Sequence, residues 1–303
     1  MTGAADLPVI AVVGPTATGK SGLGLDLAER LDGEIVNADA MQLYRGMDVG
    51  TAKLAPAERR GIPHHQLDVL EVTEEASVAA YQHAARSDVA AIRKRGRVPI
   101  LVGGSGLYVR AALDRLDLPP TDPAVRSRLE AQAADMGADA MYRLLLQQDS
   151  AAAALIQPGN LRRVIRALEV IELTGRPFSA SMPRREFVEP TVVIGLALER
   201  AVLDHRIEER VLHMWRTGLR EEVEGLLPLG LRRGFTASRA IGYAQAIAVI
   251  DGSLTEAEAI AETAQATRRL ARRQERWFRP DPRITWLQAD RPTVLDEALA
   301  LLS

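Results

Sequence analysis

The chain contains no cysteine, and only three of its 38 basic residues are lysines, namely Lys20, Lys53 and Lys94. Without cysteine it has no disulfide framework, no cysteine-based zinc site and no thiol nucleophile, which fits a reducing compartment. The common guanine-reading motif of GTPases, Asn-Lys-x-Asp, needs a lysine in a context that none of the three provides, so we expect no standard GTPase switch. Because all the other basic residues of this count are arginines, arginine clusters are less informative than usual.

Long hydrophobic runs are also missing. The apolar segment 7–13 is too short for an export signal or a membrane span, so we expect a cytoplasmic protein without a membrane partner. The net charge of −2 shows that the whole molecule is not a polycation, and contact with nucleic acid therefore requires local clustering of positive charge. A chain of 303 residues with 47% hydrophobic content can bury a large core.

The most informative pattern is a phosphate-binding loop, G-x-x-x-x-G-K-[ST], which directly follows the apolar run Val9–Val13. Backbone N–H groups of such a loop point at an anion, and the N-terminus of the following helix adds partial positive charge. The lysine neutralises the outer phosphates, and the serine hydroxyl can hold a magnesium ion. We therefore predict a phosphorylated ligand here. The loop residues are Gly14, Pro15, Thr16, Ala17, Thr18, Gly19, Lys20 and Ser21.

Short β-type runs alternate with helical patterns in the first hundred residues, which is typical of a parallel sheet with crossover helices. Strands are predicted at residues 9–13, 34–39 and 98–102, and helices around residues 23–31 and 78–92. Pro99 is tolerable only near the start of its strand. The sequence predicts an α/β fold, with a P-loop-type parallel sheet core, crossover helices and a helical insertion domain.

The insertion is expected where strand patterns disappear. Asp122 and Pro123 are typical of an N-cap and the first residue of a helix, and three helical patterns follow, the last at 161–173. The core pattern then resumes, with β-type runs at 191–198 and 284–287 and a long helical pattern at 255–279. We therefore predict a first core part at 1–121, a helical insertion at 122–187, and core completion with basic C-terminal helices at 188–303.

Polar motifs follow the first three predicted strands. In open parallel sheets, ligands bind beyond the carboxyl ends of the strands, so Asp39 and the turn Gly103–Gly106 are expected beside the phosphate loop. A carboxylate near a bound phosphate can ligate magnesium through water or act as a base on a substrate. Capping a helix or pairing with a cation is the alternative for Asp39, and the pattern does not choose between these roles.

The segment Asp39–Lys53 resembles one family closely, the tRNA dimethylallyltransferases, also called tRNA isopentenyltransferases. Further segments follow the family's order and cover nearly the whole chain: Gly14–Ser21, Ile62–His65, Leu101–Tyr108, Arg166–Val170, Arg239–Tyr243 and Arg272–Arg279. The resemblance implies transfer of a dimethylallyl group from dimethylallyl diphosphate to N6 of an adenosine. That adenosine would be the one at tRNA position 37, just 3′ of the anticodon, in tRNAs reading codons that begin with U.

The resemblance also implies residue roles. Asp39 would be the base at N6, Lys20 would offset charge on the leaving diphosphate, and Ser105 would lie beside Asp39 and the bridging oxygen. Ser21 would support Mg²⁺. An exocyclic adenine amine is a weak nucleophile, so such an enzyme must remove a proton and stabilise the departing diphosphate. The implied diphosphate-binding residues are Gly14, Pro15, Thr16, Ala17, Thr18, Gly19, Lys20, Ser21 and Arg239.

Binding of tRNA requires a positive surface, because the target base is stacked in the anticodon arm and must be turned out. Arg268, Arg272 and Arg276 recur at four-residue spacing in the long helical pattern, which predicts a basic face, although a merely solvated charged face is the alternative. The expected partners of a monomeric protein are a tRNA anticodon stem-loop and dimethylallyl diphosphate. The implied tRNA-binding residues are Asp39, Ala40, Met41, Gln42, Ser105, Arg126, Arg162, Arg163, Arg166, Gly242, Tyr243, Arg272, Arg273, Arg276 and Arg279.

Three other functions stay open. An adenylate isopentenyltransferase would prenylate free AMP and needs no tRNA surface, whereas a P-loop kinase of a small metabolite would need only the phosphate loop. A non-catalytic RNA-binding module would keep salt-dependent RNA binding when Lys20 is replaced by alanine. His64 and His65 are assigned no chemistry: adjacent residues of an extended loop face opposite ways, and a structural role is favoured over metal binding.

Overall fold

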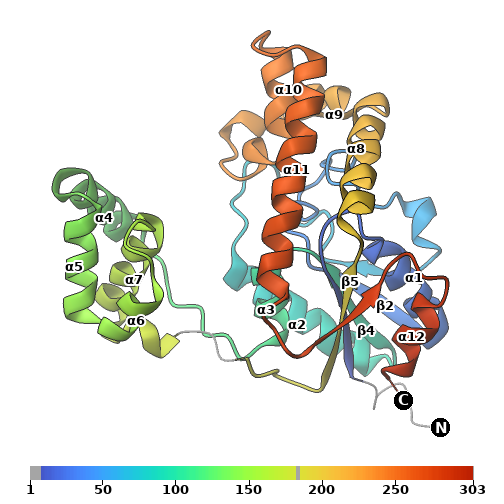
Figure 1. The fold of residues 1–303 in the computed structure, drawn as a ribbon, viewed down its shortest axis with the longest axis horizontal. Coiled ribbons are helices and arrows are strands. Elements are labelled where there is room, and N and C mark those ends of the chain that lie inside the picture. Colours follow the sequence, from blue (N-terminus) through green and yellow to red (C-terminus); the bar gives the residue numbers. More distant parts are fainter. Residues whose placement is uncertain (1–7, 182–184, 303) are drawn as a thin grey trace. The chain divides into compact units, whose positions relative to one another are not determined.

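The computed structural model describes residues 8–181 and 185–302, which form two compact units (Figure 1). The core unit comprises the described parts of residues 1–113 and 187–303, and the insertion unit comprises residues 114–186. Each unit has a hydrophobic cluster of its own.

The insertion unit begins at Asp114, earlier than the predicted residue 122, and ends one residue before the predicted 187. Hydrogen bonds account for the earlier start. The Arg115 N–H donates to the Glu186 carbonyl at 2.8 Å, so the two ends of the unit are joined. The guanidinium of Arg166 donates to the carbonyls of Pro119 and Pro120 at 2.8 and 3.0 Å, which attaches the entering segment to a helix of the insertion.

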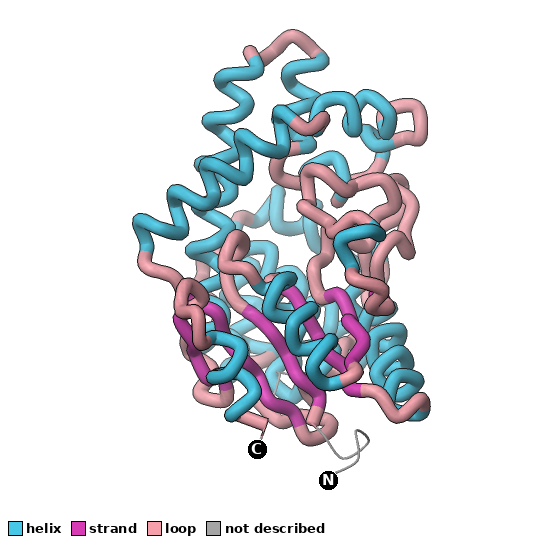
Figure 2. Tube along the Cα trace, turned by 90° about the vertical axis from the view of Figure 1, so that its right-hand side faces the viewer, coloured by secondary structure: helices cyan, strands magenta, loops and turns pink. Residues whose placement is uncertain are grey.

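Among the described residues, six parallel strands form the sheet of the core unit, in the order β3-β2-β4-β1-β5-β6. Figure 2 shows the strands of this sheet in magenta. The strands β1 and β4 are buried at every residue, as expected for central parallel strands covered by helices. The predicted parallel α/β core is confirmed. The strands are β1 (Val9–Val13), β2 (Gly33–Asn37), β3 (His64–His65), β4 (Val98–Gly103), β5 (Thr191–Ala197) and β6 (Ile284–Gln288).

Two details of the sheet differ from the prediction. The strand β2 ends at Asn37, because the Asn37 side chain accepts the Asp39 N–H at 2.9 Å and donates to the Asp39 carbonyl at 3.0 Å, which turns the chain out of the sheet. Asp39 therefore lies in the loop beyond β2. The edge strand β3 was not predicted, since its two polar residues, His64 and His65, show no hydrophobic alternation.

Helices cover both faces of this sheet (Figure 1). α1 and α12 share a hydrophobic cluster with β1, β4 and β5, whereas α2 packs against α3 and both contact β4. No helix within the described residues is long and apolar enough to cross a membrane. The helices of the core unit are α1 (Lys20–Leu31), α2 (Val78–Lys94), α3 (Gly106–Leu113), α8 (Arg200–Arg216), α9 (Leu219–Leu226), α10 (Tyr243–Ile250), α11 (Glu256–Phe278) and α12 (Val294–Ala300), with short 3-10 helices at Pro56–Arg59, Leu231–Arg233 and Ala237–Arg239.

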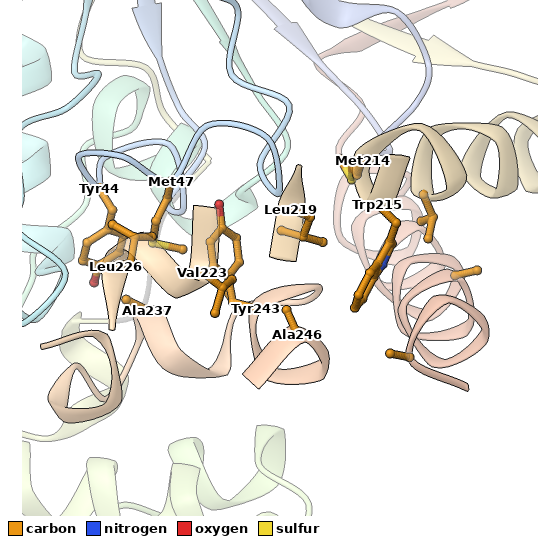
Figure 3. Packing of buried hydrophobic residues seen from close by; sticks show 14 of the residues in the cluster. Tyr44, Met47, Met214, Trp215, Leu219, Val223, Leu226, Ala237, Tyr243 and Ala246 are labelled. Atoms are coloured by element: carbon orange, nitrogen blue, oxygen red, sulfur yellow. The ribbon is translucent and has the colours of Figure 1, made fainter. Parts of the chain in front are cut away.

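A second hydrophobic cluster of the core unit joins α8, α9, α10 and α11 to the loop that follows β2 (Figure 3). Tyr44 and Met47 of this loop are fully buried in the cluster, together with Tyr243 of α10. Burial of large apolar side chains is worth about 1.5–3 kcal/mol each, so these residues anchor the loop firmly. The polar residues on either side of Tyr44 and Met47 are thereby fixed at the edge of the sheet.

The described residues of the insertion unit form four α-helices, one more than the sequence predicts. Asp122 caps the first, as predicted, by accepting the N–H groups of Ala124 and Val125. The additional helix arises at Asp149, whose carboxylate accepts the Ala152 N–H at 2.9 Å and starts a new helix directly after the preceding one ends. The helices are α4 (Pro123–Met136), α5 (Ala138–Gln148), α6 (Ser150–Leu155) and α7 (Leu161–Thr174), followed by a 3-10 turn at Phe178–Ser181.

Candidate active site

The phosphate loop connects the end of β1 to the start of α1, at the carboxyl edge of the sheet. Gly14 has a φ of 135°, and a Cβ atom there would lie 2.6 Å from the Leu196 carbonyl oxygen, so the close crossing over β5 requires glycine. The Thr18 hydroxyl donates to the Pro15 carbonyl at 2.8 Å and closes the loop on itself. Because α1 begins at Lys20, its unpaired N–H groups and positive dipole end lie at the loop.

The amine of Lys20 belongs to the same loop. Its Nζ donates to the Pro15 carbonyl at 2.6 Å. Burial and, secondly, the positive charge of Arg210 lower the pKa of Lys20 to about 7, while the negative charge of Asp39 acts in the opposite direction. A bound anion would stabilise the ammonium form, so this amine is suited to a ligand that carries negative charge.

Arg210, on α8, joins the site although no sequence motif points to it. Its guanidinium donates to the Thr16 hydroxyl at 3.3 Å and to the Thr51 carbonyl at 3.4 Å. Burial lowers the pKa of Arg210, yet a guanidinium stays charged in proteins. Arg210 falls three residues after Ile207 and four before Met214, which are buried. The sequence signal that could have identified Arg210 is its position as a charged residue on the apolar side of a helix.

Asp39 and Ser105 lie on neighbouring loops that follow β2 and β4. The Ser105 hydroxyl oxygen accepts the Ala40 N–H at 3.1 Å, and the Ser105 N–H donates to the Ala38 carbonyl at 3.2 Å. One carboxylate oxygen of Asp39 accepts the Met41 N–H at 3.0 Å, which fixes the orientation of the carboxylate. The hydroxyl and the carboxylate are thus held together at the edge where the parallel strands end.

One cavity of about 640 Å³ contains all three predicted catalytic residues, Asp39, Lys20 and Ser105. This volume is typical of a small-molecule site. Further predicted residues lining it are Thr16, Ala17, Gly19, Ser21, Ala40, Met41, Gln42, Arg239, Tyr243 and Arg273, and residues that sequence reasoning missed include Arg210, Thr51, Ala52, Met214, Thr263, Leu270 and Gln274. The predicted core-unit residues outside this lining are Gly14, Pro15, Thr18 and Gly242, which are buried, and Arg272, Arg276 and Arg279, which are exposed.

Two polar clusters brace the loop that carries Asp39. The amine of Lys53, itself only 8% exposed, contacts the carboxylates of Asp48 and Asp68, each at 2.6 Å. Glu222 of α9 accepts three consecutive backbone N–H groups of the loop and the Tyr243 hydroxyl. Lys53 thereby stabilises the loop through its two ion pairs. The Tyr243 hydroxyl donates its hydrogen bond to Glu222 within the protein.

The predicted basic face lies on α11. Its exposed members, here called the basic surface, are Arg269, Arg272, Arg273 and Arg276. Two other arginines are engaged elsewhere: Arg268 is half-buried and pairs with Glu208 at 2.5 Å, and Arg279 lies over the Trp286 ring, 4.3 Å from its centroid. Trp277, at the end of the same helix, is 47% exposed and lines the cavity.

The remaining predicted tRNA-binding residues belong to the insertion unit. Arg162 and Arg163 are exposed in the first turn of α7. The guanidinium of Arg166 is occupied by the Glu169 carboxylate at 2.9 Å and by proline carbonyls, and Arg126 lies 3.6 Å from the same carboxylate. Arg166 and Arg126 therefore have structural contacts that Arg162 and Arg163 lack in the described part of the chain.

The two histidines face opposite ways, as predicted. His64 lines the cavity, with its Nδ1 2.8 Å from the Ile62 carbonyl oxygen, and burial lowers the pKa of this histidine. His65 lies with its Nε2 2.6 Å from the buried Glu34 carboxylate, which Arg95 also contacts. Across residues 8–181 and 185–302, no cluster of three or more His, Cys, Asp or Glu residues could hold a metal ion.

A phosphate loop flanked by half-buried cations, with a carboxylate and a hydroxyl in the same cavity, defines a P-loop-type protein whose site suits a diphosphate group and proton transfer. The family model described as IPP transferase matches residues 42–281. The chain is 59% identical to a tRNA dimethylallyltransferase of Kineococcus radiotolerans over 293 residues, which cover 95% of this chain and 92% of the relative. The chain therefore belongs to the IPP transferase family.

Solved structures agree with this assignment. The full-length tRNA isopentenylpyrophosphate transferase from Bacillus halodurans is 40% identical, with a TM-score of 0.69, and the match covers 98% of this chain and 99% of that one. A eukaryotic dimethylallyltransferase acting on tRNA is 26% identical, with a TM-score of 0.83, over 98% of this chain and 77% of that one.

Proposed function

We propose that this chain transfers a dimethylallyl group from dimethylallyl diphosphate to N6 of the adenosine at tRNA position 37. The observation that carries the proposal is the single cavity of about 640 Å³ in which Asp39 and Ser105 accompany Lys20 of the phosphate loop. Relatives named tRNA dimethylallyltransferase, at 59% and 58% identity, support the reaction class.

The diphosphate is bound by the backbone N–H groups of the loop, together with Lys20 and Arg210. Lys20 gains its full charge as the anion enters, and Arg210 adds a second, half-buried cation. Both cations stabilise charge that develops on the diphosphate as the bond between its bridging oxygen and the allylic carbon breaks. Arg239 lines the same cavity and is exposed, so it is positioned to contact the outer phosphate.

Asp39 accepts the proton of the nucleophile. The N6–carbon bond forms while the carbon–oxygen bond breaks, the N6 proton passes to the Asp39 carboxylate, and the diphosphate leaves with the bonding electron pair. The Met41 N–H, which donates to Asp39, keeps the carboxylate oriented for this transfer. A base in a fixed position is worth about 10²–10⁴-fold in rate. Ser105 supports the same loop through its hydrogen bond with the Ala40 N–H.

Mg²⁺ is proposed to enter with the diphosphate. The Ser21 hydroxyl, exposed in the first turn of α1, lines the cavity, and a single protein oxygen suits an ion held mainly by substrate phosphates and water. The ion supplies charge neutralisation to the diphosphate when bound. Ser21 is the residue that would hold it.

The RNA is proposed to contact the basic surface of α11 and the arginines of α7. Phosphate contacts by Arg272, Arg273 and Arg276 would position the anticodon arm, and Arg162 and Arg163 would add further contacts. An exposed arginine surface beside the cavity favours tRNA over free AMP as the acceptor. A monomer located in the cytoplasm, where tRNA is modified, completes the proposal.

The test is mass spectrometry of nucleosides from tRNA incubated with the protein, Mg²⁺ and dimethylallyl diphosphate. A mass gain of one prenyl unit on adenosine is expected, and its absence would refute the proposed function. Labelled dimethylallyl diphosphate offered with either AMP or an anticodon stem-loop separates the two prenyl acceptors. Consumption of ATP without prenyl transfer would instead indicate a kinase, and RNA binding that survives Lys20→Ala with no transfer in the wild type would indicate a binding module.

A further inference from the structure

Gln274 of α11 links the two loops that form the cavity. Its side chain is buried, in contrast to the neighbouring arginines of the basic surface. The Oε1 atom accepts the Thr16 N–H of the phosphate loop at 2.9 Å, and the Nε2 atom donates to the Gly104 carbonyl at 3.1 Å. One amide group therefore connects the anion-binding loop to the turn that carries Ser105.

The contact between α11 and this turn is close and continuous. A Cβ atom on Gly104 would lie 2.4 Å from Gln274 Nε2, and a Cβ atom on Gly106 would lie 2.1 Å from the indole of Trp277. Gly104 and Gly106 thus permit the helix to lie directly against the turn. Ser105 lies between these two glycines, so α11 packs against the backbone on both sides of Ser105.

The other side of the same helix carries the basic surface. Arg273 directly precedes Gln274, is exposed and lines the cavity, whereas Arg272 and Arg276 are exposed outside its lining. An RNA held by these arginines acts on the helix segment from which Gln274 reaches the loops. Helices move as rigid elements, so restraint of this segment by RNA is transmitted to Thr16 and Gly104.

We propose that Gln274 is a positioning residue that couples tRNA binding on α11 to diphosphate binding in the phosphate loop. The inference rests on the proposed function, because it assigns RNA to the basic surface and a prenyl diphosphate to the loop. Bound RNA restrains α11, and Gln274 in turn restrains both loops. The diphosphate then binds to loops that are already ordered, so its binding loses less conformational entropy. By linkage, the diphosphate strengthens RNA binding by the same factor.

The experiment measures the dissociation constant of dimethylallyl diphosphate with and without a saturating anticodon stem-loop. The stem-loop carries purine in place of the reactive adenine, so no transfer occurs. For the wild type we expect a gain in affinity of about 5- to 50-fold, within the usual range of coupling between sites. For Gln274→Met, which keeps the side-chain length and removes both hydrogen bonds, we expect the gain to fall to less than twofold.

Two further variants make the result decisive. Glu262→Gln changes an exposed residue of the same helix outside the cavity lining, and its coupling should equal that of the wild type. Gln274→Glu keeps an acceptor for the Thr16 N–H and removes the donor to Gly104. Its new charge weakens diphosphate binding in both conditions, so the ratio still reports coupling, and it serves if Gln274→Met fails to fold.

The inference is overturned if the wild type shows no coupling, or if the folded Gln274 variants keep the wild-type ratio. A structural role alone would lower the melting temperature and leave this ratio unchanged. Failure of the proposed function looks different, since the wild type would then form no prenylated adenosine in unmodified tRNA. Prenylation by the wild type together with an unchanged ratio in Gln274→Met would refute only the coupling role.

Discussion

Binding of a diphosphate should draw one proton onto the protein, because the pKa of Lys20 lies at about 7 in the free chain. At pH 8 only about one tenth of the Lys20 amines are then charged, and at pH 9 about one hundredth. The bound anion favours the charged amine and restores its pKa toward the ordinary value of 10.5. Because half of the amines are charged at pH 7, diphosphate binding weakens about fivefold between pH 7 and 8 and about ninefold between pH 8 and 9, or about 2.3 kcal/mol in total.

Isothermal titration calorimetry measures this uptake directly. Dimethylallyl diphosphate is titrated without tRNA at pH 8.5, in buffers of different ionisation enthalpy, and the slope of observed heat against ionisation enthalpy gives the protons bound. We expect close to one proton for the wild type and close to none for Lys20→Arg, because a guanidinium is already charged. Zero uptake by the wild type, or equal uptake by Lys20→Arg, would refute the reasoning.

The same pKa has a consequence for stability. The folded-state pKa of Lys20 is lowered relative to the unfolded chain, so the unfolded state binds more protons between about pH 7 and 10.5. The contribution of Lys20 to the free energy of unfolding is therefore fully present above about pH 10.5. It decreases as the pH falls, because the amine must be charged in the folded protein, and it is lost below about pH 7. Consistent with this sign, Lys20→Met should raise the melting temperature of the ligand-free protein at pH 7.

Three other predictions concern transfer, folding and RNA binding. Asp39→Asn should lower single-turnover transfer by about 10²–10⁴-fold while tRNA affinity stays near that of the wild type, and near-normal transfer would remove Asp39 from the mechanism. Gly14→Ala should lower the free energy of unfolding in urea by about 1–3 kcal/mol, and a loss below about 0.5 kcal/mol would contradict the close crossing over β5. Joint replacement of Arg162 and Arg163 by alanine should reduce the slope of log binding constant against log salt concentration for the stem-loop by about one to two units. The control Arg143→Ala should leave this slope unchanged. Equal slopes for the wild type and the double variant would exclude α7 from the interface.

That Lys20, Asp39 and Ser105 line one cavity was predictable because two independent regularities coincide. Parallel strands bring their carboxyl ends to one edge, and the residues after β1, β2 and β4 are polar where the strands themselves are buried. The N-cap Asp122 was also predictable, since capping depends on local chemistry. The edge strand β3 could not be predicted, because it forms by backbone pairing with β2 and its sequence shows no hydrophobic alternation.

Arg210 and Gln274 could not be placed from the sequence for a different reason. Each is a polar residue on the inward-facing side of an amphipathic helix, and periodicity shows that it faces inward without showing which residues it contacts. Both meet Thr16, through its hydroxyl and its N–H respectively. Thr16 occupies one of the four positions at which the phosphate-loop pattern allows any residue. Helices from the second half of the chain contact the loop at this position. The phosphate-loop pattern therefore predicts the anion-binding part of the cavity. The rest of the cavity wall includes residues of α8 and α11, which contact Thr16 and which the pattern does not predict.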